Sequence, residues 1–379
     1  MFSDPLLPGG TLGVLGGGQL GRMLAAEAKR MGYRVHVFSP SGGGPAAQLS
    51  SAETVADYED EAALGAFAEA VDRVTVEFEN IPAAALEFLE KQLPVHPGPN
   101  VLHITQHRAR EKTFLREHGF PVAPFRLIEN VSELGAALTA LGSPAILKTA
   151  GFGYDGKGQA RVSSQAEAEA AFAELGGQAC VLEALIAFDR EVSVVAARSQ
   201  AGEAVCYSPT ENHHENHILS LSSVPAELSP GLKQDARQIT LEVMEALEVV
   251  GVMCAEFFVT PSGLILNELA PRPHNSGHLT LEACEVSQFE QQLRAVCGLP
   301  LGETGYRRPA AMLNLLGDLW QNGEPNWAAA LSVPGVRLHL YGKTGPRPGR
   351  KMGHLSALGE SAAAARSRVL QARAALAAS

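Results

Sequence analysis

KTAGFGYDGKGQ, residues Lys148–Gln159, begins where a short apolar strand expected over 145–148 ends. It places glycines at positions 151, 153, 156 and 158, and glycine lets the backbone approach a ligand closely. Such a loop can direct several backbone N–H groups at one anion, and Lys148 and Lys157 would add positive charge. The stretch lacks the GxxxxGK[ST] pattern of a P-loop. It predicts a phosphate-binding loop, with a mobile surface loop carrying solvated lysines as the alternative.

Composition narrows the class of protein. The chain has 379 residues, 46% of them hydrophobic, which predicts two or three domains. A formal net charge of −11 argues against a nucleic-acid or membrane-surface partner, because either would require a basic face. The five cysteines are scattered and odd in number, so we expect free thiols in a reducing cytoplasm. The first ten residues do not resemble a signal peptide, and no apolar run has the length of a membrane span.

The N-terminal residues predict a βαβ unit with a glycine-rich turn. A strand, a helix and a second strand are expected over 11–38, with GxGxxG spacing at Gly16, Gly18 and Gly21. Ser39 stands where a dinucleotide site would have an acidic residue for the ribose, which disfavours NAD. A helix N-terminus that presents N–H groups to another phosphate is the favoured interpretation.

A third N-terminal strand, expected over 73–78, carries two acidic residues near its carboxyl end. Glu77 and Glu79 share one face with Thr75, and strand C-termini face the ligand crevice of a doubly wound sheet. Both carboxylates could therefore meet a polar substrate. A solvated sheet edge is the alternative.

The chain divides into three expected domains. The prolines at positions 121 and 124 mark a boundary, so residues 1–125 form a doubly wound N-terminal domain. Residues 126–190 have the order of a small β-α-loop-β-α-β lid with the glycine loop. Residues 191–379 form an α+β C-terminal domain with a β-rich end piece and a closing helix.

Two strands expected over 252–259 and 264–268 form an acidic hairpin. A three-residue turn would pair Phe258 with Leu266 and Glu256 with Glu268, and would point Asn267 to the opposite face. Two carboxylates about 4 Å apart repel by roughly 4 kcal/mol at an effective dielectric near 20. Mg²⁺ would reverse the sign of that energy, because it binds carboxylates together with phosphate oxygens. The alternatives are a solvated Glu256 or one protonated acid.

Hydrogen-bond donors follow this hairpin. Arg272, in the loop APRPHNSGH over 270–278, is placed to meet a phosphate or a carboxylate. A basic cluster of Lys343, Arg347, Arg350 and Lys351 is a candidate phosphate clamp, with an ordinary exposed turn as the alternative. The run NHHENH over 212–217 lies in an expected loop without fixed helical spacing, which favours polar lining over a zinc site.

Taken together, these features resemble the ATP-grasp superfamily. GGGQLGRM over 16–23, YDGKGQ over 154–159, NELAPRPHNSGH over 267–278 and RPGRKMGH over 347–354 resemble 5-(carboxyamino)imidazole ribonucleotide synthase, the PurK-type family of purine biosynthesis. The similarity runs from about Thr11 to Leu358. It implies a three-domain α/β ATP-grasp fold, with Leu279 a departure from the aromatic residue usual at that position.

The resemblance implies a ligase that uses ATP and Mg²⁺ to turn bicarbonate into carboxyphosphate and then to carboxylate 5-aminoimidazole ribonucleotide. A homodimer is also implied. The residues that would surround ATP are Arg108, Lys148, Gly153, Tyr154, Asp155, Gly156, Lys157, Gly158, Gln159, Glu183, Ala184, Leu185, Ile186, Glu191, His214, Asn267 and Glu268. Residues 183–186 would be the interdomain hinge that holds adenine, and Glu191 would bind the ribose.

The resemblance also assigns the metal, substrate and reaction sites. Glu256 and Glu268 match the metal ligands. The ribonucleotide would lie among Gln19, Glu79, Tyr154, Asp155, Arg272, Lys343 and Arg350. The residues expected to act in the reaction are Asp155, Arg272, His274, Asn275 and Lys343.

Two other hypotheses remain open from the sequence. One is another ATP-grasp ligase, such as the formate-dependent glycinamide ribonucleotide transformylase or a biotin carboxylase-like enzyme. These enzymes share the ATP-binding parts, so the acceptor separates them. The other is a dinucleotide-binding oxidoreductase or a non-catalytic module built on the glycine-rich turn over 16–21.

Overall fold

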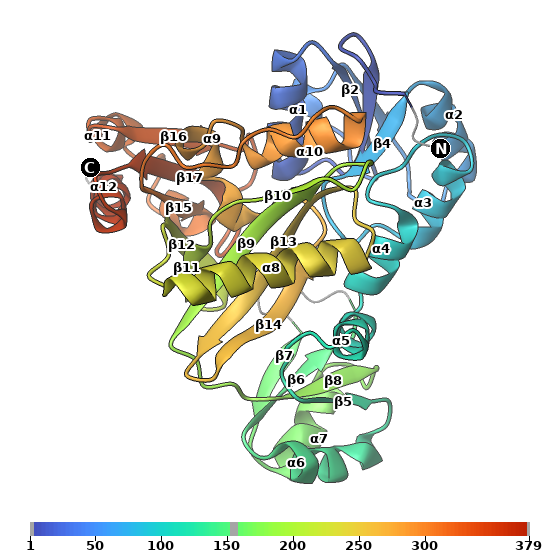
Figure 1. Cartoon of the computed structure of the whole chain (residues 1–379), viewed down its shortest axis with the longest axis vertical. Coiled ribbons are helices and arrows are strands. Elements are labelled where there is room, and N and C mark those ends of the chain that lie inside the picture. The colour runs from blue at the N-terminus through green and yellow to red at the C-terminus, as the bar shows by residue number, and fades with distance from the viewer. Residues whose placement is uncertain (1–3, 152–157, 377–379) are drawn as a thin grey trace.

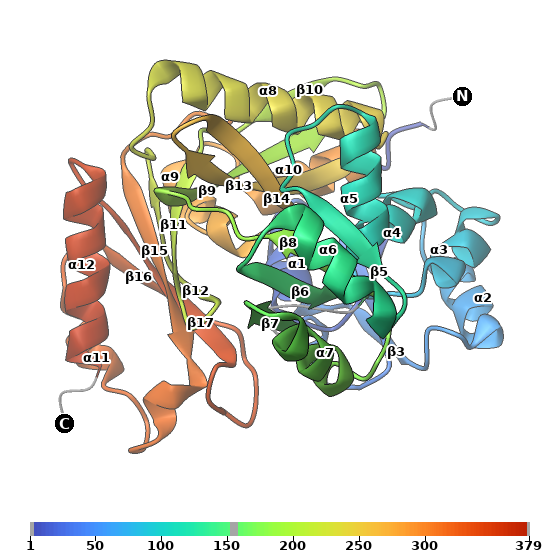
Figure 2. The ribbon, with the colours of Figure 1, turned by 90° about the horizontal axis from the view of Figure 1, so that it is seen from below.

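The computed structural model describes residues 4–151 and 158–376, which form three β-sheets and the helices that cover them (Figure 1). The sheets follow one another along the chain. In Figure 2 the second sheet, in green, lies next to the gold hairpin of the third. None of the helices in the described ranges is long and apolar enough to cross a membrane.

The N-terminal sheet is parallel, with strand order β3-β2-β1-β4. One face packs on α1, and the other packs on α2, α3 and α4. The sheet therefore has helices on both faces, as the sequence predicts. Its elements are β1 (Thr11–Leu15), α1 (Gln19–Arg30), β2 (Arg34–Ser39), η1 (Ala47–Leu49), β3 (Ala52–Val55), α2 (Glu61–Glu69), β4 (Arg73–Val76), α3 (Ala83–Glu90) and α4 (Pro99–Thr105).

The small sheet is antiparallel, with order β5-β8-β6-β7. Its two helices, α6 and α7, bury leucine, alanine and phenylalanine side chains against one face. It forms the lower part of the molecule in Figure 1. Its elements, after the connecting helix α5 (Arg108–Glu117), are β5 (Phe125–Ile128), η2 (Val131–Glu133), α6 (Leu134–Leu141), β6 (Ala145–Thr149), β7 (Gln159–Val162), α7 (Gln165–Glu174) and β8 (Cys180–Ala184).

The large sheet has nine strands in the order β14-β13-β9-β11-β12-β15-β17-β16, with β10 paired to β9. Helix α10 packs on α1 and on the N-terminal sheet, so the two sheets share a core. The elements are β9 (Arg190–Arg198), β10 (Ala204–Cys206), β11 (Thr210–Glu215), β12 (Ile218–Val224), α8 (Pro230–Ala246), β13 (Gly251–Thr260), β14 (Gly263–Ala270), η3 (Asn275–Gly277), α9 (Thr280–Ala283), α10 (Gln288–Cys297), β15 (Ala310–Leu316), η4 (Gly317–Trp320), α11 (Trp327–Leu331), β16 (Val336–Leu340), β17 (Lys351–Leu358) and α12 (Ala362–Ala375).

The turn of the acidic hairpin differs from the prediction. Thr260 pairs with Gly263, so the loop has two residues rather than three. The predicted pairing of Phe258 with Leu266 is therefore wrong, because Leu266 lies opposite Phe257.

A β-bulge restores the predicted pairing of the two acidic residues in this hairpin. The pairing shifts by one residue beyond Phe257, so that Glu256 does face Glu268, as predicted. The bulge inserts Asn267 into β14 and reverses the alternation of that strand. Leu266 is buried in the core, whereas Asn267 and Glu268 both line the cavity described below. The prediction that Asn267 points away from Glu268 is therefore wrong.

The histidine-rich run is also differently built. Residues 212–215 belong to strand β11 rather than to a loop. The turn that follows is formed by Asn216 and His217, both with positive φ. A bulge between His213 and His214 sets the direction of these side chains.

Candidate active site

A cavity of about 800 Å³ lies where the three sheets meet. The N-terminal sheet, the small sheet and the hairpin β13–β14 all contribute side chains to its wall. The predicted site residues that line it are Gln19, Glu79, Arg108, Lys148, Gln159, Glu191, His214, Glu256, Asn267, Glu268, Arg272, His274, Asn275, Lys343 and Arg350.

Other predicted residues lie elsewhere. Gly153, Tyr154, Asp155, Gly156 and Lys157 fall outside the described residues. Gly158 is described, with φ of +72° and a close approach to Thr149 that a Cβ would prevent. The proposed hinge, residues 183–186, contributes none of the described side chains of the cavity lining.

The N-terminus of α1 is occupied by a side chain of the same domain. Glu77 accepts hydrogen bonds from the backbone N–H of Gly18 at 2.5 Å and of Gly21 at 3.0 Å. A Cβ at Gly16 would lie 2.3 Å from the Glu77 side chain. Burial raises the pKa of Glu77 although these two hydrogen bonds oppose it. The expectation that these two N–H groups face a phosphate is therefore wrong, because a carboxylate already satisfies them.

Glu79 holds Arg272 at the cavity wall. The guanidinium makes a bidentate ion pair with the carboxylate, through Nε and, at 2.8 Å, through Nη2. Burial opposes the charge on Glu79, but Arg272 outweighs it and lowers the pKa of that carboxyl. Two parallel hydrogen bonds fix the plane of a guanidinium, so Arg272 presents its remaining donors in a defined direction.

Lys148 shares one carboxylate with a second buried lysine. Glu183 lies 3.1 Å from Lys148 and 3.6 Å from Lys112. Burial would raise the pKa of Glu183, but the two lysines lower it to about 2. Burial lowers the pKa of Lys148, and the pairing with Glu183 offsets that effect only in part, because Lys112 and Arg108 repel it. Two bases on one acid therefore leave excess positive charge beside the cavity.

The two acids of the hairpin each have a cationic neighbour. Glu256 Oε1 lies 2.9 Å from His274 Nε2, and Glu268 Oε2 lies 3.3 Å from Arg108 Nη1. Burial would lower the pKa of His274, but Cys254 and Glu256 raise it to about 10. Burial opposes the charge on Glu256 as well, yet the imidazolium holds the pKa of this carboxyl at about 2.

The donor set at this hairpin fits Mg²⁺. Two carboxylates and the Asn267 side chain are hard oxygen donors on adjacent strands. No cluster of three or more His, Cys, Asp or Glu residues suited to a metal occurs in residues 4–151 and 158–376. A Mg²⁺ ion here would consequently take its remaining ligands from nucleotide phosphates and water, as it does in many phosphoryl-transfer sites.

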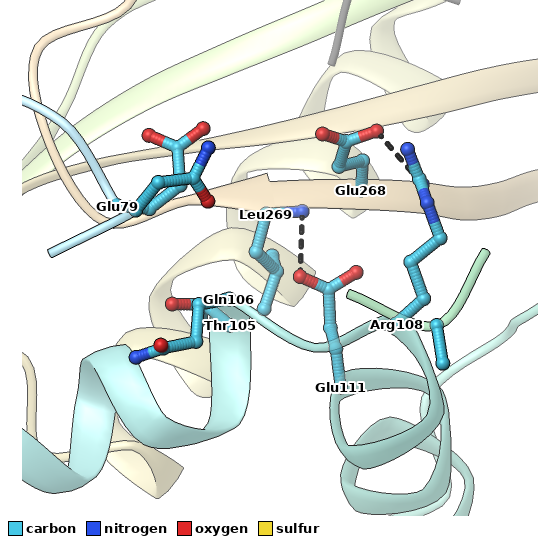
Figure 3. Close-up of a pocket in the computed structure, with 9 residues that line it drawn as sticks. Glu79, Thr105, Gln106, Arg108, Glu111, Glu268 and Leu269 are labelled. Carbon is cyan, nitrogen blue, oxygen red and sulfur yellow. Dashed lines mark hydrogen bonds and ion pairs between the residues drawn. The ribbon is translucent and has the colours of Figure 1, made fainter. Parts of the chain in front are cut away.

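A smaller cavity of about 20 Å³ lies beneath β14 (Figure 3). Glu111 and Arg108 reach it from α5, and Glu268 reaches it from the strand above. Glu111 accepts a hydrogen bond from the Leu269 backbone N–H at 3.3 Å. Burial, together with the charge of Glu268, raises the pKa of Glu111 to about 8.

One end of the large cavity combines aromatic and polar side chains. Phe188 stacks on Phe258 with ring centroids 4.5 Å apart, and both rings line the cavity. Glu191 forms an ion pair with Nδ1 of His214, which outweighs burial and raises the pKa of that histidine. A flat apolar surface next to acidic and imidazole groups suits a nucleoside.

Another part of the cavity wall is basic. Lys343 donates to the Lys351 carbonyl at 2.8 Å, and Arg350 donates to the Gly345 carbonyl at 2.9 Å and to the Thr344 carbonyl. Arg347 and Lys351 also line the cavity. The predicted basic cluster is therefore assembled at one place, where it can meet a phosphate.

Several residues of this site were not predicted. Lys112 gives no sequence signal, because a buried lysine in a polar helix resembles a solvated one. Asn80 and Phe188 follow the ends of β4 and β8, and only their neighbours in space reveal them. The residues that line the cavity without a prior assignment are Leu20, Phe78, Asn80, Ile146, Phe188 and Phe258.

Family models match most of the chain in three segments. A ribonucleotide synthetase preATP-grasp domain matches residues 10–106, an ATP-grasp domain matches 113–289, and a phosphoribosylaminoimidazole carboxylase C-terminal domain matches 310–368. The predicted ATP-grasp fold class is confirmed by these matches. The domain boundaries at residues 125 and 190 stay predictions.

Known proteins resemble the chain over nearly its full length. The N5-carboxyaminoimidazole ribonucleotide synthase of Brucella melitensis is 46% identical over 94% of this chain and 98% of its own. The crystal structure of an ADP complex of purK, an N5-carboxyaminoimidazole ribonucleotide synthetase, is 41% identical with a TM-score of 0.92 over 98% of each chain. An N5-carboxyaminoimidazole synthase from Aspergillus clavatus, solved with ADP and 5-aminoimidazole ribonucleotide, is 31% identical with a TM-score of 0.89 over 97% of this chain and 98% of that one.

Proposed function

The chain belongs to the N5-carboxyaminoimidazole ribonucleotide synthase family of ATP-grasp ligases, and from this premise we propose that its reaction takes place in the cavity between the three sheets. The enzyme converts 5-aminoimidazole ribonucleotide to the N5-carboxyamino product with ATP, in purine biosynthesis. In our proposal the carboxyl group comes from bicarbonate through carboxyphosphate, with release of ADP and phosphate. The observation that carries this assignment is the convergence of an acidic hairpin, a basic loop and the N-terminal sheet on one cavity.

The nucleotide end of the cavity is formed by the small sheet and the hairpin. Phe188 and Phe258 offer apolar surface to adenine, and Glu191 lies close enough to His214 to order a ribose contact. Lys148 supplies positive charge toward the phosphates. Mg²⁺, if held by Glu256 and Glu268, would neutralise charge on the transferring phosphoryl group.

The ribonucleotide end is formed by the N-terminal sheet and the basic loop. Lys343 and Arg350 suit its phosphate, and Gln19 lies on the side of the N-terminal sheet. Arg272, fixed by Glu79, and the charged His274 also line the cavity. Their positive charge would hold bicarbonate and stabilise carboxyphosphate next to the acceptor amine, since phosphoryl transfer depends mainly on charge and positioning.

ADP release with each candidate acceptor tests this function. We expect the full rate only with 5-aminoimidazole ribonucleotide and bicarbonate together, and background with glycinamide ribonucleotide and formate. The reverse pattern would overturn the assignment. The oxidoreductase hypothesis is not favoured, because Glu77 occupies the amides that a dinucleotide would need. As further parts of the proposal, the enzyme acts in the cytoplasm as a homodimer.

A further inference from the structure

A buried group of imidazole rings lies behind the wall of the active cavity. His278, at the end of the HNSGH loop, and His354, on β17, are both fully buried, with ring centroids 4.9 Å apart. His339 stacks on His354 at 4.4 Å, nearly parallel to it. Neither His278 nor His354 lines the cavity, so the proposed chemistry leaves both without a role.

The protonation of His278 follows from its neighbour Gln288. The Gln288 side-chain oxygen accepts from the His274 backbone N–H at 2.8 Å, which fixes the orientation of the amide. Its nitrogen donates to the His274 carbonyl at 2.7 Å and lies 3.2 Å from His278 Nδ1. Nδ1 must therefore accept this hydrogen bond. Burial lowers the pKa of His278 well below its usual value, so the ring is neutral and its proton sits on Nε2.

On the other side, His354 reaches the ribonucleotide end of the cavity through Tyr341. His354 Nδ1 lies 2.9 Å from the Tyr341 hydroxyl. The Lys343 ammonium lies 5.6 Å from the centroid of the same tyrosine ring, within the range of a cation–π contact. Tyr341 thus connects a buried imidazole to a residue proposed to bind the ribonucleotide phosphate.

The two Nε2 atoms are the open ends of this chain. Each is buried, and within the described chain neither Nε2 has a hydrogen-bond partner. A buried N–H group without an acceptor is unfavourable, and the ring centroids of the two histidines lie only 4.9 Å apart.

We propose that one water molecule accepts a hydrogen bond from Nε2 of His278 and donates one to Nε2 of His354. The chain from Gln288 through His278 and His354 to Tyr341 then positions His274 and Lys343, which both line the active cavity. These four are positioning residues, since none of them lines the cavity. His354 Nδ1 then donates to the Tyr341 oxygen, so that both neutral rings carry one proton each. The inference rests on the roles proposed above for His274 and Lys343.

The functional consequence concerns geometry rather than binding strength. Gln288 holds both backbone groups of His274, whose ring meets Glu256 at 2.9 Å. Interruption of the chain would let the HNSGH loop shift relative to the hairpin. Small displacements of a positioned group lower the rate of the chemical step while the nucleotide still binds.

Substitution of His354 separates this role from simple packing. His354→Gln places an oxygen near the position of Nε2 and keeps an acceptor for the water molecule, whereas His354→Phe fills the space with a ring that has no nitrogen. We expect kcat within about threefold of wild type for the Gln variant and roughly ten- to a hundredfold lower for the Phe variant, with the KM for ATP unchanged in both. The opposite order would show that only the shape of the ring matters and would overturn the proposal.

His339→Phe is the matched control. His339 stacks on the ring of His354, but its Nε2 pairs with Glu282 at 2.6 Å, so it is not a link in the proposed hydrogen-bond chain. We expect wild-type kcat for this variant. A loss equal to that of His354→Phe would overturn the proposal, because general loosening of the stack would then explain both.

A spectroscopic measurement does not depend on turnover or on variant folding. In wild-type protein labelled with ¹⁵N-histidine, we expect His278 to carry its proton on Nε2 and to exchange it slowly with solvent. A proton on Nδ1 would overturn the proposal even if the variants were unstable. If His274→Ala and Lys343→Ala leave catalysis unchanged while the Nε2 proton is observed, the proposed roles of those residues fail and the hydrogen-bond chain itself stands.

Discussion

At the residue scale, the site depends on how buried charges are paired. Glu268 and Glu111 face the same small cavity, but burial holds Glu111 neutral at pH 7 while Glu268 lies beside Arg108 (Figure 3). Glu183, by contrast, is held ionised by two lysines. The same residue type therefore has three different environments within one site. Substitution to glutamine, which removes charge and keeps shape, distinguishes them.

Glu268→Gln should lower turnover at least a hundredfold, because in our proposal the Glu268 carboxylate holds the Mg²⁺ ion that neutralises the ATP phosphates, and a neutral amide would hold that ion less well. Glu111→Gln is the matched control: a neutral acid is replaced by a neutral amide that can still accept from Leu269. We expect its turnover at pH 7 within about threefold of wild type. ADP release under saturating substrates measures both. A Glu268→Gln enzyme with wild-type rate would contradict the metal role.

Glu183 should make a measurable contribution to stability in acid. Its pKa of about 2 lies below the ordinary value of 4.5, so its contribution is fully present above pH 4.5 and is lost as the pH falls toward 2. The shift corresponds to about 3 kcal/mol. Glu183→Gln should lose roughly this amount at neutral pH and should lack the wild-type decline between pH 4.5 and 2.

Urea unfolding at several pH values checks this expectation. Glu169→Gln is a suitable control, since Glu169 is exposed on α7 of the same sheet unit. Equal acid dependence in wild type and Glu183→Gln would show that Glu183 is not the group responsible.

At the element scale, local sequence patterns predicted most strands and helices but not their irregularities. The strand, helix and strand expected over 11–38 and the facing of Glu256 with Glu268 are all present in the structure. The turn of β13–β14 was predicted one residue too long. The bulge at Asn267 compensated for that error, so Glu256 still faces Glu268. The alternation of polar and apolar residues did not predict this bulge, because an extra residue within a strand leaves no clear signal in that pattern.

Contacts between elements that lie far apart in the chain were the other feature that could not be predicted from the sequence. Glu77 lies 59 residues from Gly18, whose amide it caps, and Lys112 lies 71 residues from Glu183. Hydrophobic periodicity determines which face of an element is buried, but it does not state which polar group from another element will meet it. Family motifs supplied those residues of the site that local patterns could not.

The loop between β16 and β17 offers a test of one such contact. Gln48 donates to the Gly342 carbonyl at 2.7 Å and accepts from Arg22 at 2.7 Å, which ties the base of Lys343 to the N-terminal domain. A Cβ at Gly342 would lie 2.2 Å from the Gln48 side-chain oxygen. Gly342→Ala should therefore break this contact and raise the KM for the ribonucleotide roughly five- to tenfold, equivalent to about 1 kcal/mol, without changing the KM for ATP.

Gly335→Ala controls for backbone strain. Gly335 has φ of +81°, close to the +71° of Gly342, but an added Cβ would meet nothing nearer than 3.5 Å. Both variants share the cost of an alanine at positive φ, and only Gly342→Ala disturbs Gln48. Equal KM values for the two variants would contradict a role for the Gln48 contact.

At the scale of the whole molecule, the cavity lies between three sheets, of which the N-terminal and large sheets pack on each other more extensively than the small sheet packs on either. The N-terminal and large sheets share a core through α1 and α10. The small sheet has its own core and meets the rest through polar contacts, such as the Lys112–Glu183 pair and the Arg108 N–H to Ala150 carbonyl bond of 2.7 Å. It also contributes Lys148 and Gln159 to the cavity. A nucleotide bound there would contact the small sheet and the rest of the molecule at once.

We therefore expect ligand to change the cooperativity of unfolding as well as the melting temperature. Without ligand, calorimetry should show the small-sheet unit, residues 125–184, melting in a separate and earlier transition, because its apolar core is independent. A non-hydrolysable ATP analogue with Mg²⁺, at a hundred times its Kd, adds about 2.7 kcal/mol to any unit whose unfolding releases it. Since either unit's unfolding would release the ligand, the two transitions should merge.

AMP is the control, because it lacks the phosphates that we propose to lie near Lys148 and the hairpin acids, and it should leave the two transitions apart. A nucleotide that raised only the later transition would place its site within the N-terminal and large sheets alone, and would contradict the assignment of Lys148 to the phosphates.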